Sequence, residues 1–131
     1  MRLAGFILLS SLALVQQQAA YRPVATNGQL MTAFIIPSSD AIFDVDIDPP
    51  KDDAAWTRLE NHALILAESG NLLMMEGRAV AESIWMEESR ALVDAGEAAF
   101  KAAQAKDVKS MLVVGEDILI TCSRCHYQYI R

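Results

Sequence analysis

Residues 108–131 read VKSMLVVGEDILITCSRCHYQYIR. Apolar and small side chains recur in this stretch every three or four residues, the spacing of one face of an α-helix. The predicted face carries Val108, Met111, Leu112, Gly115, Ile118, Leu119, Cys122, Cys125 and Tyr129. Asp107 precedes the stretch and is a suitable N-cap. We therefore expect a long C-terminal helix whose buried stripe runs into a pair of cysteines.

Both cysteines of the chain lie in the sequence Cys122-Ser123-Arg124-Cys125-His126. C-x-x-C-H is the attachment signature of c-type haem. Residues three and four apart share one face of a helix, so Cys122, Cys125 and His126 project together. Each thiol can add to a haem vinyl group, and His126 can ligate the iron. We predict one covalently bound haem c, with His126 as the proximal ligand.

Other interpretations of the cysteine pair are less favoured. A thioredoxin-like redox couple needs a lowered thiol pKa, usually obtained at a helix N-terminus, whereas this pair lies near the end of a predicted helix, where the dipole opposes a thiolate. A zinc site needs more ligands than two cysteines and one histidine, and the only other histidine, His62, is expected at the surface. A structural disulfide in a haem-free bundle stays as an alternative.

The first helical segment is expected to begin with Asn27 as its N-cap. Its apolar residues at helical spacing are Leu30, Met31, Phe34, Ile35, Ile42 and Phe43. Pro37 interrupts the segment, because its ring removes a backbone donor and clashes with the preceding turn. We expect a kink or break near Ile36.

Two more helices are predicted between the first segment and the last. The second starts at Asp52 or Asp53 and stops at Gly77, with a seam of Trp56, Leu59, Ala63, Leu66, Gly70 and Leu73. Ser83 can cap the third, whose inner stripe is Trp85, Ser89, Leu92, Gly96, Ala99 and Ala103. The small residues of that stripe permit close approach to a neighbouring helix or to a cofactor.

The composition agrees with a single helical domain. Of 131 residues, 53% are hydrophobic but only 7% are aromatic, a balance that favours helices over sheets. The formal net charge of −6 does not favour a nucleic-acid partner. The acidic connection from Asp44 to Asp53 departs from a calcium-binding loop at Pro49 and Ala55. We predict an all-α, antiparallel four-helix bundle over residues 21–131.

Residues 1–20 resemble an export signal. Arg2 precedes the apolar run from Leu3 to Val15, which is short for a membrane span and has the length of a signal h-region. Cleavage after Ala20 would leave a periplasmic protein without stable membrane insertion. An uncleaved membrane anchor is the alternative.

With C-x-x-C-H at the end of a fourth helix, the chain resembles the cytochrome c′ family and its low-spin relatives of the cytochrome c-556 type. The resemblance covers roughly residues 27–131 and includes Tyr129, an aromatic three residues after the haem histidine. It implies a periplasmic monohaem protein that exchanges electrons with redox partner proteins or binds small gases. Homodimers are common in the family, and the oligomeric state stays open here. The sequence departs from the family at Ile130 and Asn27, where basic residues are usual.

The first helix supplies the sixth iron ligand in that family, so the resemblance makes Met31 the candidate distal ligand. A thioether ligand would give a low-spin electron carrier. The alternative is that Met31 packs in the core and leaves an open site for nitric oxide or carbon monoxide. Met74, Met75, Met86 and Met111 are weaker candidates. Nothing in the sequence predicts an enzyme, since no paired carboxylates or activated nucleophile accompany the motif.

Overall fold

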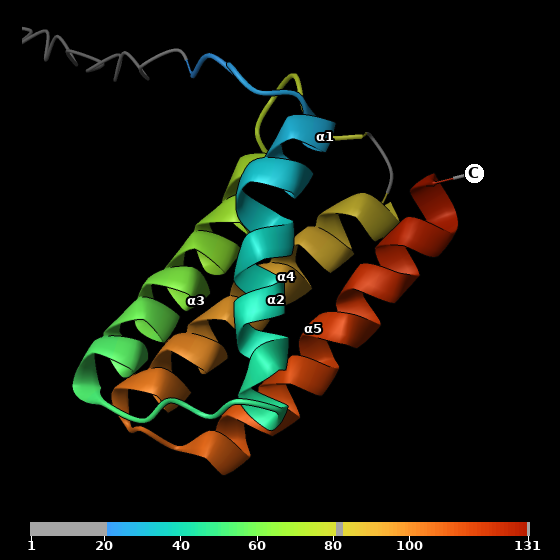
Figure 1. The fold of residues 1–131 in the computed structure, drawn as a ribbon. Coiled ribbons are helices and arrows are strands. Elements are labelled where there is room, and N and C mark those ends of the chain that lie inside the picture. The colour runs from blue at the N-terminus through green and yellow to red at the C-terminus, as the bar shows by residue number, and fades with distance from the viewer. Residues whose placement is uncertain (1–20, 81–82, 131) are drawn as a thin grey trace, which may run out of the picture.

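The computed structural model describes residues 21–80 and 83–130, and all regular structure in these ranges is helical. The first segment joins α1 (Asn27–Leu30), the π-helical turn η1 (Met31–Ile35), α2 (Ile36–Phe43) and the short 3-10 turn η2 (Asp44–Asp46). Three long helices follow: α3 (Asp53–Leu73), α4 (Ser83–Gln104) and α5 (Val108–Tyr129). The first segment and the three long helices alternate in direction along the chain (Figure 1). Helix α2 packs against both α3 and α5. The predicted antiparallel four-helix arrangement is confirmed for the described residues.

The first helical segment begins with a reciprocal cap. The Thr26 hydroxyl accepts a hydrogen bond from the Gln29 backbone N–H at 3.2 Å, and the Gln29 side-chain oxygen accepts one from the Thr26 N–H at 2.9 Å. The prediction of Asn27 as N-cap is wrong by one residue, because Gln29 stands three residues after Thr26 and completes this capping box. The Asn27 amide instead donates to the Arg78 carbonyl at 3.2 Å.

Pro37 interrupts the first segment without ending it. Proline lacks a backbone N–H, and the helix widens before it into the π turn Met31–Ile35, in which the Ile36 N–H donates to the Met31 carbonyl. The predicted break near Ile36 therefore takes the form of a π turn. A wider turn changes which residues share a face: Ile35 is buried, whereas Phe34, predicted on the buried stripe, is 43% exposed.

The other helix boundaries follow local capping. The Asp52 carboxylate accepts from the Ala55 N–H at 2.7 Å, and the Asp107 carboxylate accepts from the Ser110 N–H at 3.1 Å, as expected for N-caps. Helix α4 begins at Ser83. The predicted stop at Gly77 is wrong, because α3 ends at Leu73 and Gly77, with φ of 84°, lies in the turn beyond it.

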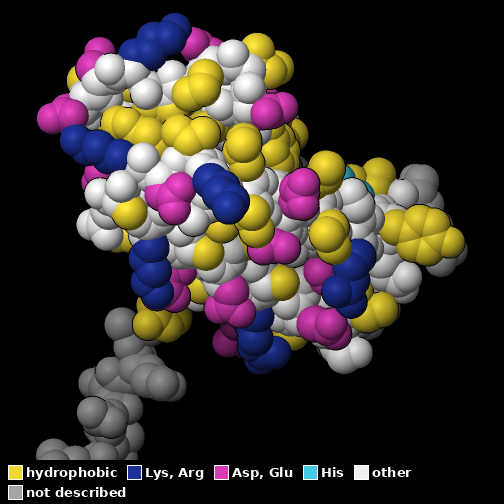
Figure 2. Space-filling view, turned by 90° about the horizontal axis from the view of Figure 1, so that it is seen from below, with side chains coloured by type: hydrophobic (Ala, Val, Ile, Leu, Met, Phe, Trp, Pro, Cys, Tyr) yellow, Lys and Arg dark blue, Asp and Glu magenta, His cyan; other side chains and the backbone are white. Residues whose placement is uncertain are grey.

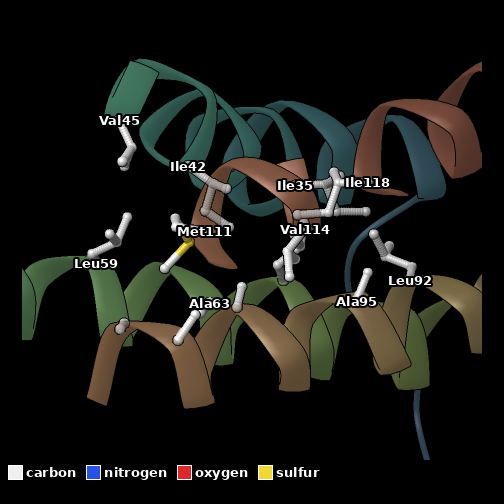
Figure 3. Packing of buried hydrophobic residues seen from close by; sticks show 14 of the residues in the cluster. Ile35, Ile42, Val45, Leu59, Ala63, Leu92, Ala95, Met111, Val114 and Ile118 are labelled. Atoms are coloured by element: carbon white, nitrogen blue, oxygen red, sulfur yellow. The ribbon is translucent and has the colours of Figure 1, made fainter. Parts of the chain in front are cut away.

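The core lies along the middle of the bundle, where side chains from all the long helices interdigitate (Figure 3). All predicted seam residues of α3 and α4 are buried. On α5 the prediction is partly wrong: Leu112 and Leu119 are 37% and 57% exposed, while Val114 is buried. These two leucines flank the side of α5 that faces the first segment, where packing is less complete than against α4. Seen from the end that carries the α4–α5 turn, apolar side chains gather in a hollow between charged ones (Figure 2).

Helices α3 and α4 approach very closely at Gly96. A Cβ atom built at Gly96 would lie 2.5 Å from the Ala67 backbone nitrogen and 2.7 Å from its Cα. The expected role of the small residues is therefore confirmed as helix–helix contact at this point.

Within residues 21–80 and 83–130, no helix combines the length and apolar character needed to cross a membrane. The predicted export signal, residues 1–20, lies outside the described residues.

Candidate haem site

A single apolar cavity of about 160 Å³ brings together the first helical segment and the end of α5. Four predicted site residues line it: Met31 from η1, and Cys122, Cys125 and His126 from α5. Most of the remaining wall is apolar, with Ile35 from the first segment as one example. In Figure 1, α2 and α5 are closest near the α4–α5 turn and diverge toward the opposite end, where this cavity opens. Residues remote in sequence are thus brought to one place.

Aromatic packing holds the last turns of α5 in position. The rings of Trp85 and Tyr129 meet edge to face, with centroids 5.2 Å apart and planes at 80°. The Trp85 indole N–H donates to the Leu73 carbonyl at 2.9 Å, which ties α4 to the C-terminal end of α3. Because Tyr129 lies one helical turn after His126, this contact fixes the helix that presents the motif.

Both cysteines are free thiols and half-buried. Burial raises the pKa of the Cys122 thiol above the usual 9.0, and the nearby Cys125 raises it further. Burial also raises the pKa of Cys125, with a second contribution from the negative charge of Glu88. Both thiols are therefore protonated near neutral pH, the opposite of what a thioredoxin-like couple requires.

The two predicted axial ligands differ in their surroundings. His126 lines the cavity from an exposed position, and Met31 is half-buried where η1 begins. The π turn puts both Ile35 and Ile36 on the cavity wall beside Met31. Met31 thus lines the same apolar cavity as the motif, from the first helical segment.

The other histidine is not part of this site. His62 is half-buried, in contrast to the predicted surface position, and its Nδ1 lies 3.3 Å from the Ser38 hydroxyl oxygen. It borders a separate hollow beside Pro49 and Pro50. In the described part of the chain, no three His, Cys, Asp or Glu side chains form a group that could hold a metal ion.

One acidic residue of the cavity wall was not singled out from the sequence. Glu88 is only 2% exposed and lines the cavity beside Cys125. The position of Glu88, three residues after Trp85 and four before Leu92, is the signal that it lies on the inner stripe.

The cavity is smaller than the roughly 300–1,000 Å³ of typical small-molecule pockets. It also opens to solvent beside the exposed His126. Its donors nevertheless suit a haem: two adjacent thiols in protonated form, one imidazole next to them, and a thioether on the facing helix. The residues present therefore fit a haem c, provided that the walls move apart to admit the macrocycle.

Comparisons of the chain with protein-family models, with curated proteins and with solved structures found no match. The function of the cavity is therefore inferred from its own residues.

Proposed function

We propose that this protein is a monohaem c-type cytochrome that transfers electrons. The observation that carries the proposal is the single apolar cavity lined by Met31, Cys122, Cys125 and His126. A motif match by itself is a hypothesis, and its strength depends on a structural context that suits the chemistry. Here that context is a helix that presents all three motif side chains to an apolar cavity, with a thioether on the facing wall.

The chain's own groups have distinct parts in the proposed site. Cys122 and Cys125 would hold the haem through thioethers, formed by addition of each thiol S–H bond across one vinyl group, with the sulfur on one vinyl carbon and the hydrogen on the other. His126 would supply a ring nitrogen to the iron, and Met31 would supply a thioether sulfur. When bound, the haem would supply one-electron redox chemistry at this site. Apolar side chains on the wall, among them Ile35 and Leu92, would shield part of the bound haem from water.

The first segment is the wall best suited to move when the macrocycle enters. Its packing against α3 and against α5 is less extensive than that of α3 against α4 or of α4 against α5. Its residues Phe34 and Ile36 are 43% and 45% exposed. An outward shift of this segment would enlarge the cavity while the tight α3–α4 contact stays in place. The site would then form around the attached group.

A second candidate function is binding of a small gas. The wall around Met31 is formed by Ile35 and Ile36, both apolar. If Met31 packs against them instead of ligating, the distal face would be an apolar pocket suited to nitric oxide or carbon monoxide. The coordination state of the iron separates the two functions.

Under either function we place the protein in the periplasm, as the predicted export signal implies. Redox partner proteins would meet the exposed His126 edge, where the cavity reaches the surface. A homodimer stays as a further proposal.

The test is expression in a host that exports proteins and attaches c-type haem. We expect a product that keeps its haem on a denaturing gel and in mass analysis, and that gives a low-spin spectrum with no response to carbon monoxide. A high-spin spectrum that shifts with carbon monoxide would support the gas-binding function. Absence of attached haem from the wild type, in a host that matures a control cytochrome, would refute both functions.

The matched variants are Cys122→Ala, Cys125→Ala and His126→Ala. Each cysteine change should leave at most one thioether, and the histidine change should keep covalent attachment but alter the spectrum. Ser123→Ala is the control, because Ser123 lies between the anchors and is exposed outside the cavity.

A further inference from the structure

A buried carboxylate faces the proposed haem cavity. The side chain of Glu88, in the second turn of α4, is only 1% exposed, and it shares the cavity wall with Cys122, Cys125 and His126. Neither of its carboxylate oxygens has a hydrogen-bond partner within residues 21–80 and 83–130. A buried carboxylate without donors is costly unless another charge compensates it.

Arg124 compensates the negative charge of Glu88 only in part. The Arg124 guanidinium Nε lies 3.0 Å from one Glu88 oxygen, without hydrogen-bond geometry. Arg124 also donates from Nη2 to the Glu87 carboxylate at 3.1 Å. Because the Arg124 side chain is 58% exposed, solvent screens its charge far more than that of Glu88. The cavity therefore faces a net negative charge.

The field of Glu88 reaches the motif. Its buried side chain lines the same apolar cavity as Cys125 and His126. Cys125 is directly followed by His126, the proposed iron ligand. A charge that acts on the second anchor also acts on a metal centre bound beside it, since the cavity has a low dielectric constant.

We propose that Glu88 lowers the reduction potential of the haem by stabilising the ferric state. The inference rests on the proposed haem function. Ferric iron carries one more positive charge than ferrous iron, so a buried carboxylate on the wall favours the oxidised form. Glu88 thus acts on the ferric–ferrous equilibrium through its charge. It neither binds the iron nor tethers the haem.

Glu88→Gln and Glu87→Gln are a matched pair for the test. Both carboxylates lie within 3.1 Å of Arg124, but the side chain of Glu87 is 61% exposed and outside the cavity wall. In potentiometric titrations, Glu88→Gln should raise the midpoint potential by at least about 59 mV, a tenfold change in the ferric–ferrous equilibrium of a one-electron couple. Glu87→Gln should shift it by less than half as much.

Arg124→Gln provides a second test, in which the midpoint potential should shift in the opposite direction. This test does not depend on whether the Glu88→Gln variant folds. Removal of the guanidinium leaves Glu88 less compensated, so the midpoint potential should fall. A Glu88→Gln shift no larger than that of Glu87→Gln, or an unchanged or higher potential in Arg124→Gln, would overturn the inference.

Attached haem is measured in the same samples by a haem stain on denaturing gels. If the wild type carries haem but the variants keep its midpoint potential, the role of Glu88 is refuted and the proposed function is not. Wild type without haem refutes the proposed function and the role of Glu88 with it.

Discussion

Substitution of Gly96 by alanine tests the close packing that holds α3 and α4 together. The added Cβ would stand 2.5 Å from the Ala67 nitrogen, whereas ordinary van der Waals contact begins at 3.4 Å. The obstructing atoms belong to the α3 backbone, so no side-chain rotation can make room. The two helices must separate by about 0.9 Å at this point.

The expected cost follows from two opposing effects. Overpacking of a dense core typically destabilises by about 1–3 kcal/mol, and a clash with backbone belongs at the upper end of that range. Alanine in place of glycine in a helix interior offsets about 1 kcal/mol of this cost. The net loss is therefore about 2 kcal/mol, which corresponds to roughly 8 °C in the midpoint of thermal unfolding for a domain of this size.

The measurement is thermal unfolding followed by circular dichroism at 222 nm, with wild type and variants in the same state of haem loading. Gly28→Ala is the control, because a Cβ there meets nothing within 4 Å. Gly28→Ala should leave stability unchanged or raise it by up to about 1 kcal/mol. A Gly96→Ala variant as stable as wild type would refute the argument from the α3–α4 distance.

Four further predictions concern the site and one helix end. Met31→Ala should convert a low-spin ferric haem to high spin in the absorption spectrum; an unchanged low-spin spectrum would exclude Met31 as a ligand. In the haem-free protein, the pH profiles for alkylation of Cys122 and Cys125 should have midpoints above the usual thiol pKa of 9.0, because burial raises both pKa values, and a midpoint below 9.0 would contradict this. The neutral thiols contribute stability that is complete below the unfolded-state pKa and is lost as pH rises through the higher folded values, so the haem-free protein should denature more readily in alkali. Asp52→Ala should destabilise α3 by about 1 kcal/mol in urea unfolding, while Asp52→Asn, which retains a capping oxygen, should lose much less.

The positions of the helices and most of their buried faces were predictable from the sequence, because they depend on local periodicity and local capping. The seam of α3 from Trp56 to Leu73 is one case, and the Asp52 and Asp107 caps are others. The shared face of Cys122, Cys125 and His126 follows from helix geometry alone. Even the local errors have local causes: both Thr26 and Asn27 are acceptable caps, and the Gln29 side chain decides between them.

Only the tertiary structure decided which helical faces are covered by neighbours. Leu119 and Phe34 have the spacing of core residues, yet they are exposed: Leu119 flanks the side of α5 that faces the first segment, and the π turn shifts Phe34 off the buried face. Glu88 is buried because α5 brings Arg124 and the motif over the inner face of α4. The meeting of Met31 with the C-terminal motif in one cavity is likewise a product of packing between remote segments. Periodicity assigns a side chain to a face of its own helix, but burial depends on what lies opposite that face, which is a non-local property.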